Sequence, residues 1–267
     1  MTALQAIVLA VVQGLTEFLP VSSSAHLILV PRFLGWPDQG QVFDLATHIG
    51  SLIAVLVYFR QELMELLAAV PRLFSREAVR FGSEPALLFN LGIGTIPAAI
   101  AGLLFAHFVA NGARDPHLIA WTTLIFGLLL GVADWMGRGQ RDEHQVSWPQ
   151  ALLIGFFQAI ALLPGTSRSG ATITAGRFTG LSRPGAARFS FLLSVPVGLL
   201  VTAKEGLDLL HGEGARIGTL PLVLGFTVSA ITSFVVIAWL LRFLQRRSLL
   251  VFVVYRVLLA VLLFVWF

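Results

Sequence analysis

The residues best suited to chemistry lie near the start of the chain, in the segment QGLTEFLPVSSSAHLILV (Gln13–Val30). Glu17, three consecutive serines at 22–24 and His26 come within ten residues of one another, inside an otherwise apolar region. A carboxylate holds divalent cations or acts as a base. An imidazole transfers protons or attacks phosphorus, and a serine hydroxyl binds phosphate oxygens or serves as a nucleophile. Together these groups favour phosphoryl transfer to water.

A second polar segment, PGTSRSGATI (Pro164–Ile173), contains the complementary groups. Its hydroxyls precede an expected short helix, where they suit the N-cap position. A helix N-terminus offers free N–H groups and the positive end of the helix dipole to an anion. Arg168 adds bidentate donors that match phosphate oxygens, and Gly165 and Gly170 let the backbone approach a ligand closely. This segment is therefore predicted to bind phosphate.

Each of these residues also has a structural interpretation. Ser22 and Ser24 are good helix caps, Glu17 is compatible with a membrane interface, and Arg168 is long enough to snorkel. Arg256 lies within the last apolar segment, and we expect it to snorkel to the cytoplasmic headgroups. The remaining histidines are scattered and are interpreted as structural or surface residues: His48, His107, His117, His144 and His211.

The composition places this chemistry in a membrane. The chain has 267 residues, of which 57% are hydrophobic and 12% charged, and its mean hydropathy is +0.85. A typical soluble domain is about 25% charged. The ranges 86–112 and 217–241 have no Asp, Glu, Lys or Arg, and a bilayer span needs roughly 20 residues. We predict a single all-α, polytopic membrane domain over residues 1–267. The absence of cysteine excludes disulfides and thiolate metal sites.

The first polar segment has a counterpart in the second half of the chain. Leu4–His26 resembles Pro149–Thr172: Gln13 matches Gln158, and Pro20 matches Pro164 after a one-residue gap. Three long apolar segments follow each copy. They are 42–60, 86–108 and 117–136 in the first half, and 186–204, 219–241 and 250–267 in the second. This arrangement predicts repeat halves of approximately 1–140 and 145–267.

The repeated opening is too short to span a bilayer. A helix over 5–19 measures roughly 22 Å against a hydrocarbon core of ~30 Å, and Pro20 ends it. A second short helix is expected over 24–34. Two short helices with a polar turn are typical of a re-entrant pair that lines a cavity. We predict six transmembrane helices plus two re-entrant helix pairs, ten helices in all, in an inverted-topology repeat.

Arginine placement predicts the orientation. Eleven arginines fall in the connections assigned to one side, and four basic residues fall in those assigned to the other, which indicates that the first side is cytoplasmic. Both termini are then expected outside, with the two polar turns meeting near the midplane. The first group is Arg60, Arg72, Arg76, Arg80, Arg138, Arg141, Arg183, Arg188, Arg242, Arg246 and Arg247, and the second is Arg32, Arg114, Lys204 and Arg216.

The motifs QGLTEFLPVSSSAH and LPGTSRSGATI resemble the two signature segments of the undecaprenyl-diphosphate phosphatase family, also called the bacitracin-resistance family. The similarity extends over nearly the whole chain, including HIGSLIAVLVYF and RFSFLLSVP. The resemblance implies a bacterial cytoplasmic (inner) membrane enzyme whose site faces the periplasm. Such an enzyme hydrolyses the C55 isoprenyl diphosphate to the monophosphate carrier lipid, supports cell-wall synthesis and confers bacitracin resistance. It also implies a divalent cation, Mg²⁺ or Ca²⁺.

The resemblance assigns catalytic roles to Glu17, Ser23, His26 and Arg168, with Glu17 also as metal ligand and Ser23 as a proposed nucleophile. Many family members have a second glutamate where this chain has Gln13. An amide cannot replace a carboxylate as a base or a charged ligand, but it can position water or phosphate. The predicted substrate-binding residues are Gln13, Ser22, Ser24, Thr166, Ser167, Ser169, Gly165, Gly170 and Thr172.

Several alternatives remain open from the residues alone. Ser23 or His26 can attack phosphorus, or His26 can activate water. A transporter of the polyprenyl phosphate carrier lipid would use a similar anion site at the midplane. A non-catalytic scaffold would leave the intramembrane Glu-Ser-His-Arg set unexplained. The expected partners are the polyprenyl diphosphate lipid and the bilayer, with a possible homodimer; nucleic acid is not expected.

Overall fold

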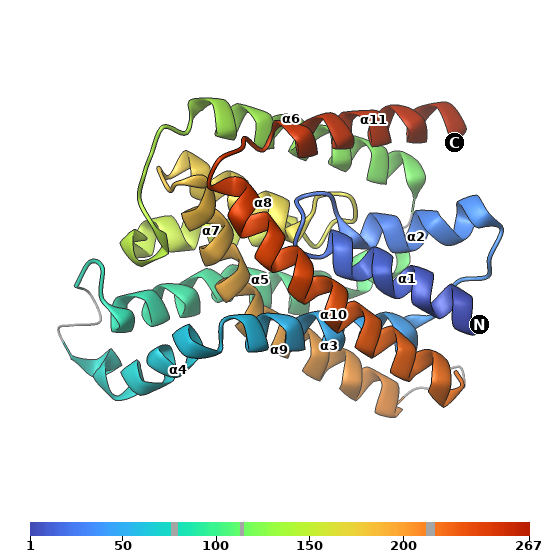
Figure 1. Ribbon diagram of the computed structural model, residues 1–267, viewed down its shortest axis with the longest axis horizontal. Helices are drawn as coiled ribbons and strands as arrows, with labels where there is room; N and C mark the ends of the chain where they lie inside the picture. Colours follow the sequence, from blue (N-terminus) through green and yellow to red (C-terminus); the bar gives the residue numbers. More distant parts are fainter. Residues whose placement is uncertain (76–79, 113–114, 212–216) are drawn as a thin grey trace.

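The computed structural model describes residues 1–75, 80–112, 115–211 and 217–267, except for the side chains of 105–112, 210 and 211. Arg76, Arg114 and Arg216 and the side chains of His107 and His211 lie outside this description. The described residues form eleven α-helices and no strand (Figure 1). The helices are α1 (Ala3–Thr16), α2 (Ser23–Leu34), α3 (Gln41–Tyr58), α4 (Arg60–Ala69), α5 (Glu84–Gly112), α6 (Pro116–Met136), α7 (Trp148–Ile160), α8 (Arg168–Phe178), α9 (Arg183–His211), α10 (Thr219–Leu244) and α11 (Leu250–Trp266).

The expected all-α architecture is confirmed, with two corrections. Helix α4 occupies part of a range expected to be a loop, so the ten predicted helices become eleven. Helix α1 ends at Thr16, earlier than the predicted end at residue 19, and Glu17 therefore stands at the start of the turn. Helix α2 begins at Ser23 because Ser22 caps it, and it ends at Gly35, whose φ of 64° is left-handed.

Five helices are long and apolar enough to cross a membrane: α3, the range 84–104 of α5, α6, the range 183–209 of α9, and α10. Helix α11, the sixth expected span, has 17 residues and so measures only about 25 Å. Large apolar side chains are exposed on these helices, while several glutamine, serine and threonine side chains are buried among the apolar residues of the interior. This distribution is typical of a multi-pass membrane protein, whose outer surface meets lipid and not water.

Small residues let the helices pack closely. A Cβ on Gly14 of α1 would lie 2.6 Å from Thr232 Cβ of α10, and a Cβ on Gly155 of α7 would lie 2.5 Å from the Gly94 carbonyl of α5. Such close approach is the usual basis of helix association in lipid. Each contact joins the opening helix of one predicted half to the second apolar segment of the other. Helices α6 and α11, the third apolar segments of those halves, lie side by side (Figure 1).

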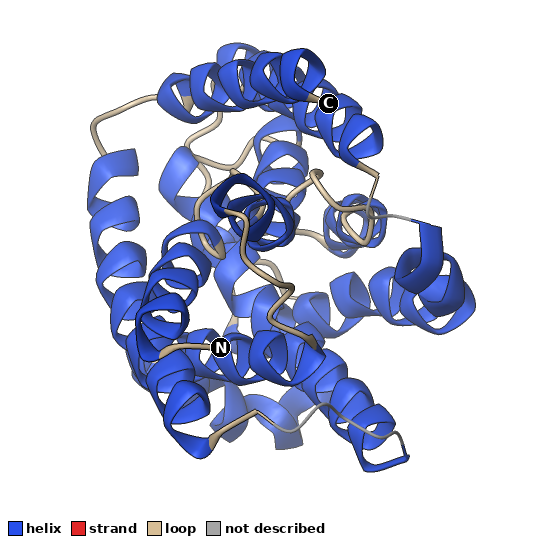
Figure 2. Cartoon of the chain, turned by 90° about the vertical axis from the view of Figure 1, so that its right-hand side faces the viewer, coloured by secondary structure: helices blue, strands red, loops and turns tan. Residues whose placement is uncertain are grey.

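This packing brings the two polar turns together inside the molecule. The turn between α1 and α2 is linked to α8 by a hydrogen bond in which Ser169 Oγ donates to the Leu19 carbonyl at 2.9 Å. Beside it, Phe18 packs edge-on against Phe191 of α9, with ring centroids 5.2 Å apart. In Figure 2, loop segments lie within the surrounding helices. Irregular backbone at this depth is expected only where protein or a cavity surrounds it.

Candidate active site

The first turn is built around Ser22. This residue has φ of 77°, and its hydroxyl accepts a hydrogen bond from the Ala25 N–H at 3.5 Å, which caps α2. Its Oγ also lies 3.2 Å from the Oγ of Ser24. Ser22 is buried and Ser24 is exposed. Both serines predicted to bind substrate therefore help to shape the turn.

The second turn repeats this construction at Ser167. Its φ is 70°, its hydroxyl accepts from the Gly170 N–H at 3.1 Å, and its Oγ lies 3.2 Å from that of Ser169. Ser22 and Ser167 are the two non-glycine residues with positive φ in the described part of the chain. Each follows its matched glutamine, Gln13 or Gln158, by nine residues. Strained backbone of this kind costs about 1–3 kcal/mol and is concentrated at functional sites.

Glu17 connects the two turns. Its Oε1 accepts from Arg168 Nη2 at 2.7 Å, and its Oε2 accepts from Ser23 Oγ at 2.7 Å and from Gln13 Nε2 at 3.0 Å. The carboxylate is buried, and Arg168 is about one-fifth exposed. Three predicted catalytic residues and the predicted binding residue Gln13 thus meet at one carboxylate. In the described structure, the remaining guanidinium donors of Arg168 have no hydrogen-bond partner.

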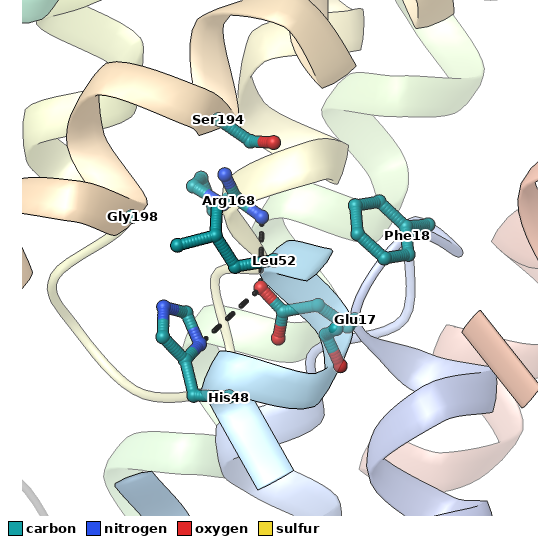
Figure 3. Close-up of a pocket in the computed structure, with 8 residues that line it drawn as sticks. Glu17, Phe18, His48, Leu52, Arg168, Ser194 and Gly198 are labelled. Carbon is teal, nitrogen blue, oxygen red and sulfur yellow. Dashed lines mark hydrogen bonds and ion pairs between the residues drawn. The ribbon is translucent and has the colours of Figure 1, made fainter. Parts of the chain in front are cut away.

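His48 is a member of this site that sequence reasoning missed. Its Nδ1 lies 3.9 Å from Glu17 Oε1, and its buried Nε2 has no hydrogen-bond partner in the described structure (Figure 3). Together with Arg168 and Glu17 it lines a cavity of about 10 Å³, completed by Phe18, Ser51, Leu52, Ser194 and Gly198. That volume holds about one water molecule. The available signal was an ionisable residue within an apolar span.

His26 is held apart from the carboxylate. Its Nδ1 lies 2.7 Å from the Ser22 carbonyl, and its Nε2 lies 2.5 Å from the hydroxyl of Tyr255 on α11. The two rings are stacked, with centroids 5.8 Å apart. Both nitrogens are therefore occupied, and neither contacts Glu17 in the described structure. The imidazole in this arrangement fixes α2 against α11.

Several hydroxyls of the second turn hold the fold locally. Thr172 Oγ1 donates to the Arg168 carbonyl at 2.8 Å and lies 2.6 Å from Ser190 Oγ of α9. Thr166 differs, because its buried Oγ1 has no partner in the described residues. Gly165 has φ of 88°, and a Cβ there would strike the side chain of Thr122. Only glycine fits this position without displacing α6.

The expectation that Arg256 snorkels to the headgroups is wrong. The residue is 0% exposed and lies between α6 and both turns. Its guanidinium donates to five backbone carbonyls: Thr123 at 3.1 Å, Pro20 at 3.2 Å, Thr166 at 3.0 Å, Thr122 at 3.4 Å and Gly165 at 2.8 Å. The Arg256 side chain can point into the protein because five backbone carbonyls accept its hydrogen bonds, so it needs no carboxylate partner.

Comparison with known proteins identifies the group to which this architecture belongs. The model of the bacitracin resistance protein BacA family matches residues 6–262. The chain belongs to this family. The match includes both polar turns, His48 and Arg256, so the whole site described above lies within the family's boundaries.

Curated relatives of this bacitracin-resistance family member are similar over their full length. Undecaprenyl-diphosphatase 2 of Stutzerimonas stutzeri (strain A1501) is 51% identical, with 100% of this chain and 99% of the relative covered. The undecaprenyl-diphosphatase of Nitrosococcus oceani is 49% identical, with 97% of each chain covered. That of Magnetococcus marinus (strain MC-1) is 47% identical, with 99% of this chain and 98% of the relative covered.

The expected divalent cation can be tested against the residues present. No group of three or more His, Cys, Asp or Glu suited to a metal is found in the described residues. Glu17 is the single carboxylate lining the cavity. Mg²⁺ is commonly held by one or two carboxylates together with substrate phosphates and water. The site therefore fits a cation that binds with the substrate diphosphate, and it does not form a complete protein cage.

Proposed function

We propose that the protein hydrolyses undecaprenyl diphosphate to undecaprenyl phosphate and phosphate, which recycles the carrier lipid for cell-wall synthesis and confers bacitracin resistance. The observation that carries this proposal is the convergence of Ser23 and Arg168, from opposite turns, on the two oxygens of Glu17. In the proposed reaction, Ser23 is the nucleophile, Glu17 the base and Arg168 the phosphate ligand. The names of the relatives support the same substrate.

In the proposed first step, Ser23 Oγ attacks the terminal phosphorus. Glu17 Oε2, 2.7 Å from this hydroxyl, accepts its proton as the O–P bond forms. The bond from phosphorus to the bridging oxygen breaks, and undecaprenyl phosphate leaves with that oxygen and takes up the proton. The free donors of Arg168 bind the phosphoryl oxygens, where positive charge is most effective in phosphoryl transfer.

In the second step, water attacks the phosphorus of the serine ester. Its oxygen forms the new O–P bond as the Ser23 O–P bond breaks, and inorganic phosphate is released. Glu17 accepts a proton from the water and returns it to Ser23 Oγ, which restores the starting state. The cavity between Glu17 and His48 has room for about one water molecule beside this carboxylate.

A divalent cation, Mg²⁺ or Ca²⁺, would be held by Glu17 and would supply further neutralisation of the diphosphate. Gln13 donates to Glu17 and keeps its carboxylate oriented. Thr166 Oγ1, which is unpartnered in the described residues, suits a phosphate oxygen. The serines and glycines of the turns contribute by shaping the backbone at the starts of α2 and α8.

Ser23 is favoured over His26 as nucleophile. His26 would have to give up contacts of 2.7 Å and 2.5 Å before it could attack phosphorus or activate water. Ser23 already donates to a carboxylate. A pure transporter of the carrier lipid would have no use for this hydroxyl–carboxylate pair. The relatives are also named as diphosphatases and not as transporters.

For the membrane arrangement, we propose that α11 is the sixth span, and that α1–α2 and α7–α8 are re-entrant pairs in two inverted halves. The equivalent contacts of α1 with α10 and of α7 with α5 support this proposal. The arginine distribution supports an orientation with both termini on the outer side of the membrane. Membership of the bacitracin-resistance family supports the bacterial cytoplasmic (inner) membrane as the location, with the entrance to the site on the periplasmic side.

The decisive experiment measures phosphate release from undecaprenyl diphosphate by the purified protein in detergent, with and without a chelator. We expect metal-dependent release that falls by at least about 10⁴-fold in Ser23→Ala, the scale of loss when a nucleophile is removed. Ser182→Ala is the matched control, because Ser182 caps the start of α9 away from the turns. Absence of release by the folded wild type would refute the function, and an active Ser23→Ala would refute the nucleophile.

A further inference from the structure

Arg256 is an unusual feature of the site, because it is a buried cation without a counter-ion. Its hydrogen bonds all go to backbone carbonyls, and no carboxylate forms a salt bridge with it in the described part of the chain. A buried ion without a partner costs several kcal/mol. Charged residues retained at this depth in a membrane protein are functional by default.

The five carbonyls that accept from Arg256 lie on both polar turns and on α6. Nη1 joins the two turns directly, since it donates to Pro20 of the first at 3.2 Å and to Thr166 of the second at 3.0 Å. Nη2 reaches Gly165 at 2.8 Å, and Nε reaches Thr123 of α6 at 3.1 Å. One planar guanidinium therefore sets the spacing of both turns against a long helix.

The surrounding residues make room for this side chain. A Cβ on Gly170 would lie 2.9 Å from Arg256 Nη1, and a Cβ on Gly127 of α6 would lie 2.9 Å from Arg256 Cβ. The preceding residue of α11, Tyr255, contacts His26 at 2.5 Å. Consecutive residues of α11 thus hold both the first turn and the helix that follows it.

The positive charge of Arg256 has no counter-ion among the described residues, whereas that of Arg168 has one. Arg168 is paired with Glu17 at 2.7 Å, so its charge is largely balanced before substrate binds. Among the described residues that contact the turns, Arg256 is the cation left unbalanced. Because the site lies in a low-dielectric region, this charge favours a bound anion without touching it.

We propose that Arg256 is a positioning residue for phosphate transfer: it clamps the two turns at the spacing that lets Ser23 and Arg168 reach the same phosphate, and its unpaired charge favours the bound diphosphate. This inference rests on the proposed function. A misplacement of about 1 Å from a residue outside the chemistry costs roughly 100-fold in rate. Loss of the clamp should therefore lower kcat as well as weaken anion binding.

The test compares Arg256→Met and Arg256→Lys with the matched control Arg177→Met. Arg177 is also a buried arginine that donates to backbone carbonyls, those of Leu181 and Gly137, but it lies at the far end of α8 and has Asp134 as a counter-ion at 3.6 Å. For each folded variant we would measure thermal unfolding, kcat and KM for undecaprenyl diphosphate, and calorimetric binding of inorganic diphosphate with Mg²⁺. A purely structural arginine would lower the unfolding temperature without changing kcat per folded molecule.

We expect kcat to fall about 100-fold and diphosphate binding to weaken about tenfold in Arg256→Met. Arg256→Lys should restore much of the binding, because it keeps the charge, but little of kcat, because an ammonium cannot reach all five carbonyls. Arg177→Met should change neither per folded molecule. If Arg256→Met does not fold, Arg256→Lys alone tests the clamp: diphosphate binding close to that of the wild type together with a lowered kcat would support it.

Wild-type kcat and diphosphate binding in both Arg256 variants would overturn the clamp while leaving the phosphatase intact. An equal loss of kcat in Arg177→Met would also overturn it. A wild type that binds diphosphate without hydrolysing the lipid would instead refute the proposed function. In that case, unchanged diphosphate binding in Arg256→Met would refute the clamp separately.

Discussion

The two polar turns share the serine cap that starts each short helix, but they differ in chemistry. Each has a buried serine with positive φ that caps a short helix, and each pairs that serine with a second one at 3.2 Å. The next residue along the chain differs: it is Ser23 in the first turn and Arg168 in the second. Equivalent positions thus supply a hydroxyl and a guanidinium, and both meet at Glu17.

This difference shows how a repeat can build an asymmetric site. Two copies of the second turn would offer two anion sites without a base, and two copies of the first would lack the guanidinium. With Glu17 on one side only, the first turn supplies the proposed base and nucleophile, and the second supplies the proposed phosphate ligand. The shared geometry sets where the groups point, and the unshared residues determine the reaction.

The largest expected effect comes from making the two turns alike. Arg168→Ser would give the second turn the residue found in the first, and kcat should fall by at least about 10³-fold, the scale reported for arginines that stabilise transferring phosphoryl groups. Phosphate release per folded molecule measures this. Arg168→Lys should recover only part of the rate, since an ammonium lacks the planar pair of N–H donors with which a guanidinium binds two phosphate oxygens. A kcat for Arg168→Ser within about tenfold of the wild type would remove Arg168 from the reaction.

A smaller effect tests whether the turns share backbone strain. At both Ser22 and Ser167, the glycine variant should be more stable than the alanine variant by about 1 kcal/mol, because glycine adopts positive φ freely and is only slightly worse as a cap. Thermal unfolding in detergent provides the comparison. Ser182→Gly and Ser182→Ala serve as the control pair, because Ser182 is absent from the residues of positive φ. Equal stability of the variants within either turn would contradict strain there.

The smallest effect concerns the matched glutamines. Gln13→Glu would place a second carboxylate beside Glu17, and the Mg²⁺ concentration for half-maximal activity should fall about fivefold, since two carboxylates hold the ion better than one. Gln158→Glu should leave it unchanged, because Gln158 contacts the Gly94 carbonyl at 3.3 Å instead of the site. An unchanged Mg²⁺ requirement in Gln13→Glu would argue against Glu17 as the metal ligand.

Much of this arrangement was predictable from the sequence because the signals are local. The hydroxyl clusters predicted the starts of both short helices, and the prolines predicted where the helices before them end. The meeting of Glu17 with Arg168 was anticipated only in outline, as two turns converging at mid-depth. The direct ion pair depends on how α1, α7 and their partners pack, which no local pattern contains.

His48 and Arg256 show where sequence reasoning fails. Both are ionisable residues in apolar segments, and whether such a side chain faces lipid, headgroups or the interior depends on the rotation of its helix. Arg256 was expected to reach the headgroups because it lies within the last apolar segment and its side chain is long. Its actual partners are backbone carbonyls, which occur at every residue of any sequence. Acceptors of this kind leave no compositional signal.

The order of these contacts along the chain has a consequence for biogenesis. Arg256 of α11 donates to the carbonyl of Pro20, and the neighbouring Tyr255 contacts His26. These contacts join residues more than 200 positions apart in the sequence. Closing so large a loop costs conformational entropy, so the contacts form late in folding. The ribosome must therefore have translated α11 before the first turn gains its support, and a nascent chain that lacks this helix has no clamp between the two turns.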